Sequence, residues 1–341
     1  MMKKKATIHD ISKALKINSS TVSRALNNSN RVSQKTKKLI QKKASELGYQ
    51  KNSLASNLRT NKTNTIGIIV PRISRNFFSS VISGIEETAY KSGYNVVIGQ
   101  SLENFEREKE LVSTFLSNRV DGLLISVSME TTSDFHLQNF KNNGGPIVFF
   151  DRPMTMENTP SIHIDDYKAS YDATEHLINN GCKHIVHFSG IQKIALYKRR
   201  MEGYMAALKD HNIPVKASYI LESKLSEKDG IVLANKVMKL PQVDGIFSSN
   251  DTAAISAIQH FKKNGIQIPK DIALVGFNND PISAVIEPSL TTINQPDIEM
   301  GTIASSLLIE LIKRTIDHPS KHSKTLETEL IARGSTFRKT N

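Results

Sequence analysis

The chain has 341 residues and is 38% hydrophobic and 23% charged, which favours two or three domains with real cores. No run approaches the ~18 apolar residues that a membrane-spanning helix needs, and the basic start at residues 1–5 leads into no apolar segment. These features exclude collagen-like, disulfide-rich and membrane classes and argue against secretion. The single cysteine, Cys182, cannot form an internal disulfide, so we expect a cytoplasmic protein.

The formal net charge of +12 is concentrated at the N-terminus. Residues 1–62 hold fifteen Lys and Arg against two acids, whereas the remainder holds thirty bases against thirty-one acids. A basic module joined to a near-neutral body is typical of a nucleic-acid binder that carries a separate domain. From charge alone, a disordered basic tail or a membrane-surface patch remains an alternative.

The order of residues inside the basic segment predicts three short helices. Thr7 and Asp10 fit a capping box at the start of the first helix, and Asn18 or Ser19 can cap the second. Ser33 opens a third helix, which Gly48 ends. The side chains expected to face inward from the second and third helices are Val22, Ala25, Leu26, Ile40, Ala44 and Leu47.

Three short helices with a tight turn between the first two predict a helix-turn-helix domain over residues 1–50, whose second helix enters the DNA major groove. Ser20 and its small neighbours allow close approach to the bases, and Arg24 can reach a guanine or a phosphate. A generic three-helix bundle is the alternative, but it does not account for so many bases. The expected DNA contacts are Thr7, Asn18, Ser19, Ser20, Thr21, Ser23, Arg24 and Asn27.

Residues 51–62 are predicted to form a hinge helix and linker. Leu54 and Leu58 lie on one face of about two helical turns, with no local core to bury them. A helix this short is marginal alone in water. The segment is therefore either a flexible linker or a helix that orders when a dimer pushes it into the minor groove.

The rest of the chain alternates short apolar strands with helices of about 10–15 residues, which is typical of parallel sheets with right-handed crossovers. Strand-like runs include residues 65–70, 94–98, 122–126, 147–151, 162–165, 184–188, 245–249 and 272–277. About eleven strands fit two doubly wound lobes better than the rival fold, a single eight-stranded barrel. Two lobes with a cleft between them suit a sensor of small ligands.

The segment from Ala6 to Thr60 resembles the DNA-binding headpiece of the lactose-repressor/purine-repressor family. Residues 21–27 match the core of the family's recognition helix, and residues 54–59 match its hinge helix. The resemblance implies that Leu58 intercalates in the minor groove with Arg59 beside it. It continues through residues 150–152, 200–204, 249–251 and 288–296. It therefore implies that residues 63–341 form a ligand-binding and dimerisation domain similar to periplasmic sugar-binding proteins.

The same resemblance implies effector contacts at Phe77, Phe78, Asp151, Arg152, Arg200, Phe247, Asn250 and Asn278. Aromatic rings stack on a sugar face or a purine, amides and carboxylates bind hydroxyls, and arginine holds paired oxygens. Two readings stay open: Phe247 fits a plain core aromatic equally well, and Asp151–Arg152 also fits a structural ion pair. Asn278 stands where many members carry Asp, so hydroxyl recognition there would be neutral.

Enzyme classes have little support in the sequence. Phosphate-loop, dinucleotide, zinc-protease and serine-hydrolase motifs are absent, and His184 and His187 lack nearby ligand partners, so we expect no metal and no cofactor. We expect a homodimeric, ligand-controlled repressor of a carbohydrate-utilisation operon, bound to near-palindromic operator DNA and not to a membrane. A sugar or sugar acid is the favoured effector. A purine-responsive regulator, a free sugar-binding protein and a DNA-bound enzyme are the alternatives.

Overall fold

A computed structural model describes residues 6–49 and 62–337. The contacts of the chain divide it into two compact units, residues 1–63 and 64–341. The predicted hinge helix, with Leu58 and Arg59, lies outside the described residues. No helix in the described ranges is long and apolar enough to cross a membrane.

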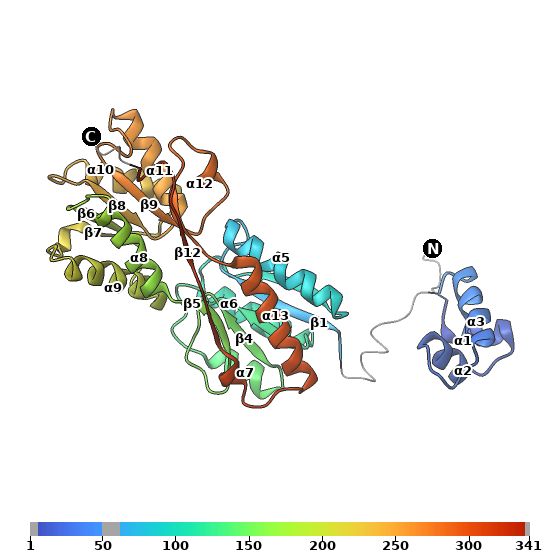
Figure 1. Ribbon diagram of the computed structural model, residues 1–341. Coiled ribbons are helices and arrows are strands. Elements are labelled where there is room, and N and C mark those ends of the chain that lie inside the picture. The colour runs from blue at the N-terminus through green and yellow to red at the C-terminus, as the bar shows by residue number, and fades with distance from the viewer. Residues whose placement is uncertain (1–5, 50–61, 338–341) are drawn as a thin grey trace. The chain divides into compact units, whose positions relative to one another are not determined.

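The first unit is the predicted three-helix domain, formed by α1 (Ile8–Leu15), α2 (Ser19–Leu26) and α3 (Gln34–Glu46) (Figure 1). The capping box at α1 is confirmed, because the backbone N–H of Thr7 donates to Asp10 Oδ2 at 2.8 Å and the Thr7 hydroxyl accepts from the Asp10 N–H at 3.4 Å. Asn18, rather than Ser19, caps α2 by accepting from the Ser20 N–H at 3.0 Å. These caps satisfy N–H groups that a helix start leaves unpaired.

The core of this unit is small and includes one charged residue. Its buried apolar side chains are Ile11, Val22, Ala25, Val32, Ile40 and Ala44. The expectation that Leu47 is buried was wrong: its side chain is 40% exposed, because it lies at the C-cap of α3, past the inward-facing turn. Lys37 is only 4% exposed, and its Nζ donates to the backbone and side-chain oxygens of Asn28 at 3.2 and 2.9 Å. The lysine thereby fastens α3 to the loop after α2.

The second unit consists of two lobes, each built on a six-stranded sheet. The first sheet has the order β11-β5-β4-β3-β1-β2, and its paired strands are parallel. Its strands are β1 (Thr65–Val70), β2 (Asn95–Gln100), β3 (Gly122–Ile125), β4 (Ile147–Phe150), β5 (Ser161–Ile164) and β11 (Lys324–Leu326). Its helices are α5 (Asn76–Lys91), α6 (Phe105–Ser117), α7 (Phe135–Asn142) and α13 (Asp297–Lys313).

The second lobe repeats this plan with the order β12-β10-β9-β8-β6-β7, in which only β12 runs antiparallel to its neighbour. Its strands are β6 (Ile185–Ser189), β7 (Ile220–Glu222), β8 (Gly245–Ser248), β9 (Ala273–Phe277), β10 (Thr291–Asn294) and β12 (Glu329–Ile331). Its helices are α8 (Asp166–Asn179), α9 (Ala195–Asp210), α10 (Glu227–Val237), α11 (Asp251–Lys263) and α12 (Ile282–Val285). Two doubly wound lobes are thus confirmed against the barrel.

The chain crosses between the lobes three times, from β5 to α8, from β10 to α13 and from β11 to β12 (Figure 1). Each crossing leaves from the end of a strand. The carboxyl ends of strands in both sheets therefore border the space between the lobes, which is where open α/β sheets bind ligands.

Helices α5 and α13 lie side by side in the first lobe (Figure 1) because glycines let their backbones touch. A Cβ atom on Gly84 would overlap the carbonyl oxygen of Ile298, and one on Gly301 would overlap that of Val81. Helix α13 directly follows the second crossing, and α5 begins beside the space between the lobes. The contact between α5 and α13 therefore fixes the start of α5 relative to the connection between the lobes.

Candidate functional site

The expected DNA-contacting side chains within the described residues lie on α2, at the two ends of α2 and at the N-cap of α1. Asn18, Ser20, Arg24 and Asn27 are exposed, whereas Ser19, Thr21 and Ser23 are half-buried. Arg24 Nη2 donates to the hydroxyl of Ser20, one turn earlier, at 3.1 Å. Its guanidinium therefore lies along the outer face of α2. Thr7 is exposed, but its hydroxyl also donates to Asp10 Oδ2 at 2.7 Å, so it helps to hold the start of α1.

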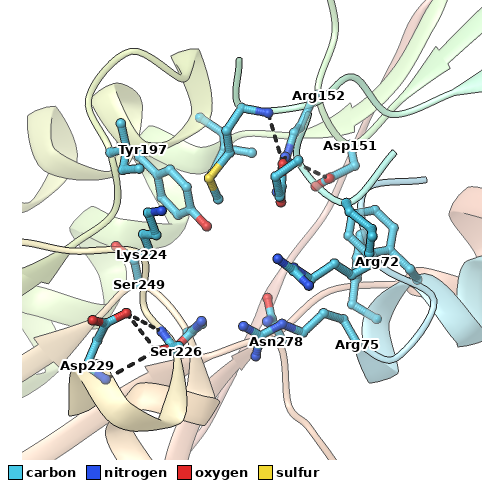
Figure 2. A pocket seen from close by; sticks show the side chains of 18 of the residues that line it. Arg72, Arg75, Asp151, Arg152, Tyr197, Lys224, Ser226, Asp229, Ser249 and Asn278 are labelled. Carbon is cyan, nitrogen blue, oxygen red and sulfur yellow. Dashed lines mark hydrogen bonds and ion pairs between the residues drawn. The ribbon is translucent and has the colours of Figure 1, made fainter. Parts of the chain in front are cut away.

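The second unit contains a cavity of about 1010 Å³ between its lobes (Figure 2). Its walls come from the segments that follow strands in both sheets. They include residues 72–78 after β1, 102–104 after β2, 129–132 after β3, 151–152 after β4, 191–200 after β6, 224–229 after β7, 249–250 after β8, 278–280 after β9 and Gln295 after β10. The volume suits a small organic molecule rather than a polymer.

Seven of the eight predicted effector residues line this cavity: Phe77, Phe78, Asp151, Arg152, Arg200, Asn250 and Asn278. Phe247 is the exception and is corrected to a core residue. It lies in β8, is fully buried, and its ring stacks on His187 with centroids 4.8 Å apart. Its side chain is on a face of the sheet that packs against α8 and α9, away from the carboxyl ends that form the cavity wall.

Arg152 is held by carboxylates in the first lobe. Its Nη1 and Nη2 donate to the two carboxylate oxygens of Glu103 at 2.8 and 3.2 Å, and Nη1 also donates to the Val127 carbonyl. Its Nε lies 3.6 Å from Asp151 Oδ2, which also accepts from the Ser126 hydroxyl at 3.0 Å. Burial raises the pKa of Asp151 to about 6, against the opposing effect of Arg152. The pair is structural and still borders the cavity.

Arg200 occupies the equivalent place in the second lobe. It is 4% exposed, and its Nε donates to Asp166 Oδ1 at 2.7 Å while Nη1 donates to the Ser249 carbonyl at 2.8 Å. Its guanidinium carbon lies 3.5 Å from the centre of the Phe277 ring, a close cation–π contact. Arg200 thus ties α9 to the first turn of α8 and to the end of β8.

The two predicted asparagines differ in what they offer a ligand. Asn250 caps α11: its Oδ1 accepts from the Ala253 N–H, and its Nδ2 donates to the Leu225 carbonyl, both at 2.9 Å. Its amide therefore already serves the protein. Asn278 has a left-handed φ of 114°, and its Oδ1 accepts from Gln295 Nε2 at 2.8 Å, so its Nδ2 is the group directed to other partners.

The sequence reasoning missed several cavity residues, chiefly Arg72, Arg75, Lys193, Tyr197, Lys224, Lys228, Ser249 and Gln295. Tyr197 lies three residues before Arg200 on α9, a spacing that shares a helix face, so it was recoverable. Ser249 directly precedes Asn250 at the end of β8 and was recoverable for the same kind of reason. Arg72, Lys193 and Lys224 lie in loops, where no periodicity marks a direction, and Lys228 is the second residue of α10.

In the described part of the chain, no three His, Cys, Asp or Glu side chains are placed so that they could hold a metal ion. His187 is fully buried between the rings of Tyr204 and Phe247, and its Nδ1 donates to the Phe247 carbonyl at 3.1 Å. Burial lowers the pKa of His187 to about 3, which keeps the imidazole neutral. It is a core side chain.

Comparisons with known proteins match both units. The family model of bacterial regulatory proteins of the lacI family matches residues 7–52, and that of periplasmic binding proteins and the sugar-binding domain of the LacI family matches residues 63–332. The transcriptional repressor CytR of Escherichia coli is 33% identical over 332 residues, which are 97% of this chain and 96% of the relative.

Solved structures agree with this match. The lac repressor dimer bound to operator and the anti-inducer ONPF superposes with a TM-score of 0.86 over 98% of this chain and 100% of that one, at 24% identity. A periplasmic binding protein/LacI transcriptional regulator of Alkaliphilus metalliredigens, complexed with D-xylulofuranose, is 28% identical with a TM-score of 0.71. The match covers 81% of this chain and 100% of that structure.

Proposed function

Because the chain belongs to the LacI family of bacterial regulatory proteins, and is thus a ligand-responsive DNA-binding transcription regulator, we propose that it represses a carbohydrate-utilisation operon. It does so as a homodimer on a near-palindromic operator, without catalytic activity. Residues 1–50 bind DNA, residues 51–62 form the hinge and residues 63–341 sense the effector and dimerise.

The observation that carries this proposal is the cavity at the lobe crossings, which combines hydrogen-bonding groups with aromatic faces. Phe77 and Phe78 meet edge to face with centroids 5.2 Å apart, and both border the cavity. From α9 in the second lobe, Tyr197 directs its hydroxyl into the cavity (Figure 2). Such a mixture suits a small polyhydroxylated molecule. The relative that binds D-xylulofuranose supports a sugar.

A purine or nucleoside is the second candidate, because the same three aromatic rings offer faces and edges to a flat base. The two candidates differ in what they need from Phe78. A base that stacks loses most of its affinity in Phe78→Leu, whereas a sugar held mainly by polar groups retains more.

In the DNA-binding unit, the proposed readers of base edges are the exposed polar side chains on α2, and the proposed phosphate contacts include the caps of α1 and α2. Leu58 is proposed to intercalate in the minor groove with Arg59 beside it. Leu58→Ala should then weaken specific binding and leave non-specific binding nearly unchanged.

Regulation follows from the position of the cavity. A ligand that contacts both lobes binds the closed arrangement more tightly, and closing the lobes changes the spacing of the two headpieces in a dimer. We expect a coupling between effector and operator of about 1–3 kcal/mol, or roughly 5–150-fold in operator affinity.

The test begins with in vitro selection from random duplex DNA, which should return a near-palindromic consensus. A thermal-shift screen of sugars, sugar acids and purines then identifies effectors, because a ligand of the native state stabilises by mass action. Fluorescence anisotropy finally measures operator affinity with and without each hit. A consensus lacking two-fold symmetry would contradict the homodimer, and a stabilising ligand that leaves operator affinity unchanged would contradict the coupling.

A further inference from the structure

The charged side chains around the cavity are unequally satisfied by the protein itself. The acidic ones are Glu103, Glu130, Asp151, Asp229 and Asp280, and the basic ones are Arg72, Arg75, Arg152, Lys193, Arg200, Lys224 and Lys228. The first set has a net charge of −5 and the second of +7. Which charges face a ligand depends on which of them already have partners.

Four of the five carboxylates are used inside the protein. Glu103 accepts from Arg152 and from the Met129 N–H at 2.9 Å, and Asp151 accepts from a serine hydroxyl. Glu130 accepts from the Phe105 N–H at 3.3 Å at the start of α6, and Asp229 accepts from the Ser226 N–H at 2.9 Å in the capping box of α10. These four carboxylates thus already have hydrogen-bond donors within the protein, and Glu103 is also paired with a cation.

The basic side chains are distributed differently. Arg152 and Arg200 are paired with carboxylates, and Arg75 Nη1 donates to the Thr252 hydroxyl at 2.7 Å. Four cations have no hydrogen-bond or ion-pair partner within the described ranges, and all four are exposed: Arg72, Lys193, Lys224 and Lys228. They come from both lobes, and Figure 2 shows Arg72 reaching into the cavity from one wall with Lys224 on the opposite wall.

We propose that the effector carries an anionic oxygen group, a phosphate monoester or a carboxylate on a polyhydroxylated skeleton, and that Arg72 and Lys224 recognise it from opposite lobes. This inference rests on the proposed role of the cavity as the effector site. An anion placed between the lobes neutralises cations that otherwise repel each other across the gap. The anion therefore favours closure of the lobes. A neutral sugar cannot replace the anion, because a neutral ligand leaves these cations unpaired as the lobes approach.

Two parts of the cavity share the recognition of the ligand. The four exposed cations Arg72, Lys193, Lys224 and Lys228, which we call the rim, recognise the anionic group. The inner end of the cavity, including Asn278 and Tyr197, contacts the hydroxyl groups of the ligand. Four unpaired cations match a phosphate monoester better than a single carboxylate, since the phosphate carries nearly two negative charges at neutral pH.

The first experiment uses inorganic phosphate as the probe with the full chain. Phosphorus NMR line broadening should show saturable binding that sulfate competes away. Arg72→Gln and Lys224→Gln should each weaken it by about fivefold or more, the effect of losing one charge-assisted contact. Arg107→Gln on α6 and Lys236→Gln on α10 are matched controls: they remove one charge from the same lobes outside the cavity and should change binding by less than about twofold. Absence of saturable binding, or equal loss in test and control variants, overturns the proposal.

The second experiment separates the anion from the skeleton by calorimetry with glucose, glucose 6-phosphate and gluconate, and with ribose and ribose 5-phosphate. We expect an ester or acid to bind at least about tenfold more tightly than its neutral parent, with that advantage lost in Arg72→Gln. If only the phosphate esters bind more tightly than their neutral parents, the anionic group is a phosphate; if only gluconate binds more tightly than glucose, the group is a carboxylate.

If neutral sugars alone bind and alter operator affinity, the anion proposal fails while the proposed function stands. If anionic ligands bind but no ligand alters operator affinity, the proposed function fails while the anion site stands. If none of these ligands binds, the anion proposal is overturned for the cavity.

Discussion

Replacing Arg200 should destabilise the sensor unit far more than its role as one ligand contact would suggest. The Asp166 carboxylate that it contacts at 2.7 Å has a side chain only 10% exposed, and Arg200 itself is 5% exposed in its side chain. In Arg200→Met the carboxylate remains buried without its partner. Removing one member of a buried ion pair costs about 3–5 kcal/mol.

The double variant Arg200→Met/Asp166→Asn removes the unpaired charge as well, so it should be more stable than Arg200→Met alone. The difference between the summed single effects and the double effect should be about 2–3 kcal/mol, since the pair is nearly dry and its geometry is good. Urea unfolding of the full chain followed by circular dichroism measures all four proteins. The exposed pair Lys168–Asp172 on α8 is the control, with an expected coupling below about 0.5 kcal/mol.

The pH dependence gives a second readout. Burial raises the pKa of Asp166 in the native protein and Arg200 opposes that effect, so the pKa is higher still in Arg200→Met. A carboxyl group with a raised folded-state pKa stabilises most below its unfolded value and loses that stability as pH rises. The defect of Arg200→Met should therefore shrink in mild acid. A coupling energy equal to that of the control pair, or a defect that does not vary with pH, refutes this account of Arg200.

Three further predictions concern other sites. Arg24→Ala should cost about 1–3 kcal/mol at the selected operator only if the arginine reads a base, and anisotropy should show equal losses on all sequences if it binds phosphate. Lys37→Ala should lower the stability of the DNA-binding unit by about 1–3 kcal/mol, because it removes two hydrogen bonds to Asn28 and the packing of a nearly buried side chain; a change in the melting temperature of that unit no larger than for an exposed lysine variant would contradict this. Burial raises the pKa of Asp251 to about 7, so sensor stability should fall between the carboxyl's unfolded value near 4 and pH 7, by at most about 1.4 kcal/mol per pH unit. Asp251→Asn keeps an oxygen for the Asp280 N–H and should flatten that slope in urea titrations; an unchanged slope would assign it to other groups.

The sequence allowed much of this architecture to be predicted because it is encoded locally. A capping box needs only Thr7 and Asp10, which are three residues apart. The alternation of strands and helices along the chain predicts two doubly wound lobes. Other features depend on partners far away in the chain. Nothing near Lys37 indicates that its ammonium group will donate to Asn28, and the three-residue strands β7 and β11 exist only through pairing with β6 and β5.

The cavity was predictable to the same extent. A family resemblance located residues at the ends of strands, and seven of them do border the cavity. It did not distinguish an aromatic at a strand end from one a residue or two earlier, which is why Phe247 was misplaced. Nor did it reveal that the amide of Asn250 already caps α11 and bonds to Leu225, because that contact joins residues 25 positions apart.

The difference between cavity residues that also hold the fold together and cavity residues that do not has a consequence for engineering. Arg152, Arg200 and Asn250 cannot be exchanged freely, since each also holds two elements of the fold together. Arg72 and Lys224 lie on loops and bind nothing else in the described chain, so their replacement costs little stability. A library confined to such loop positions should therefore change which molecule is sensed while most variants still fold and still bind DNA. The fold is therefore suited to the design of biosensors, because loop residues that recognise the ligand can be replaced without disturbing the residues that stabilise the lobes.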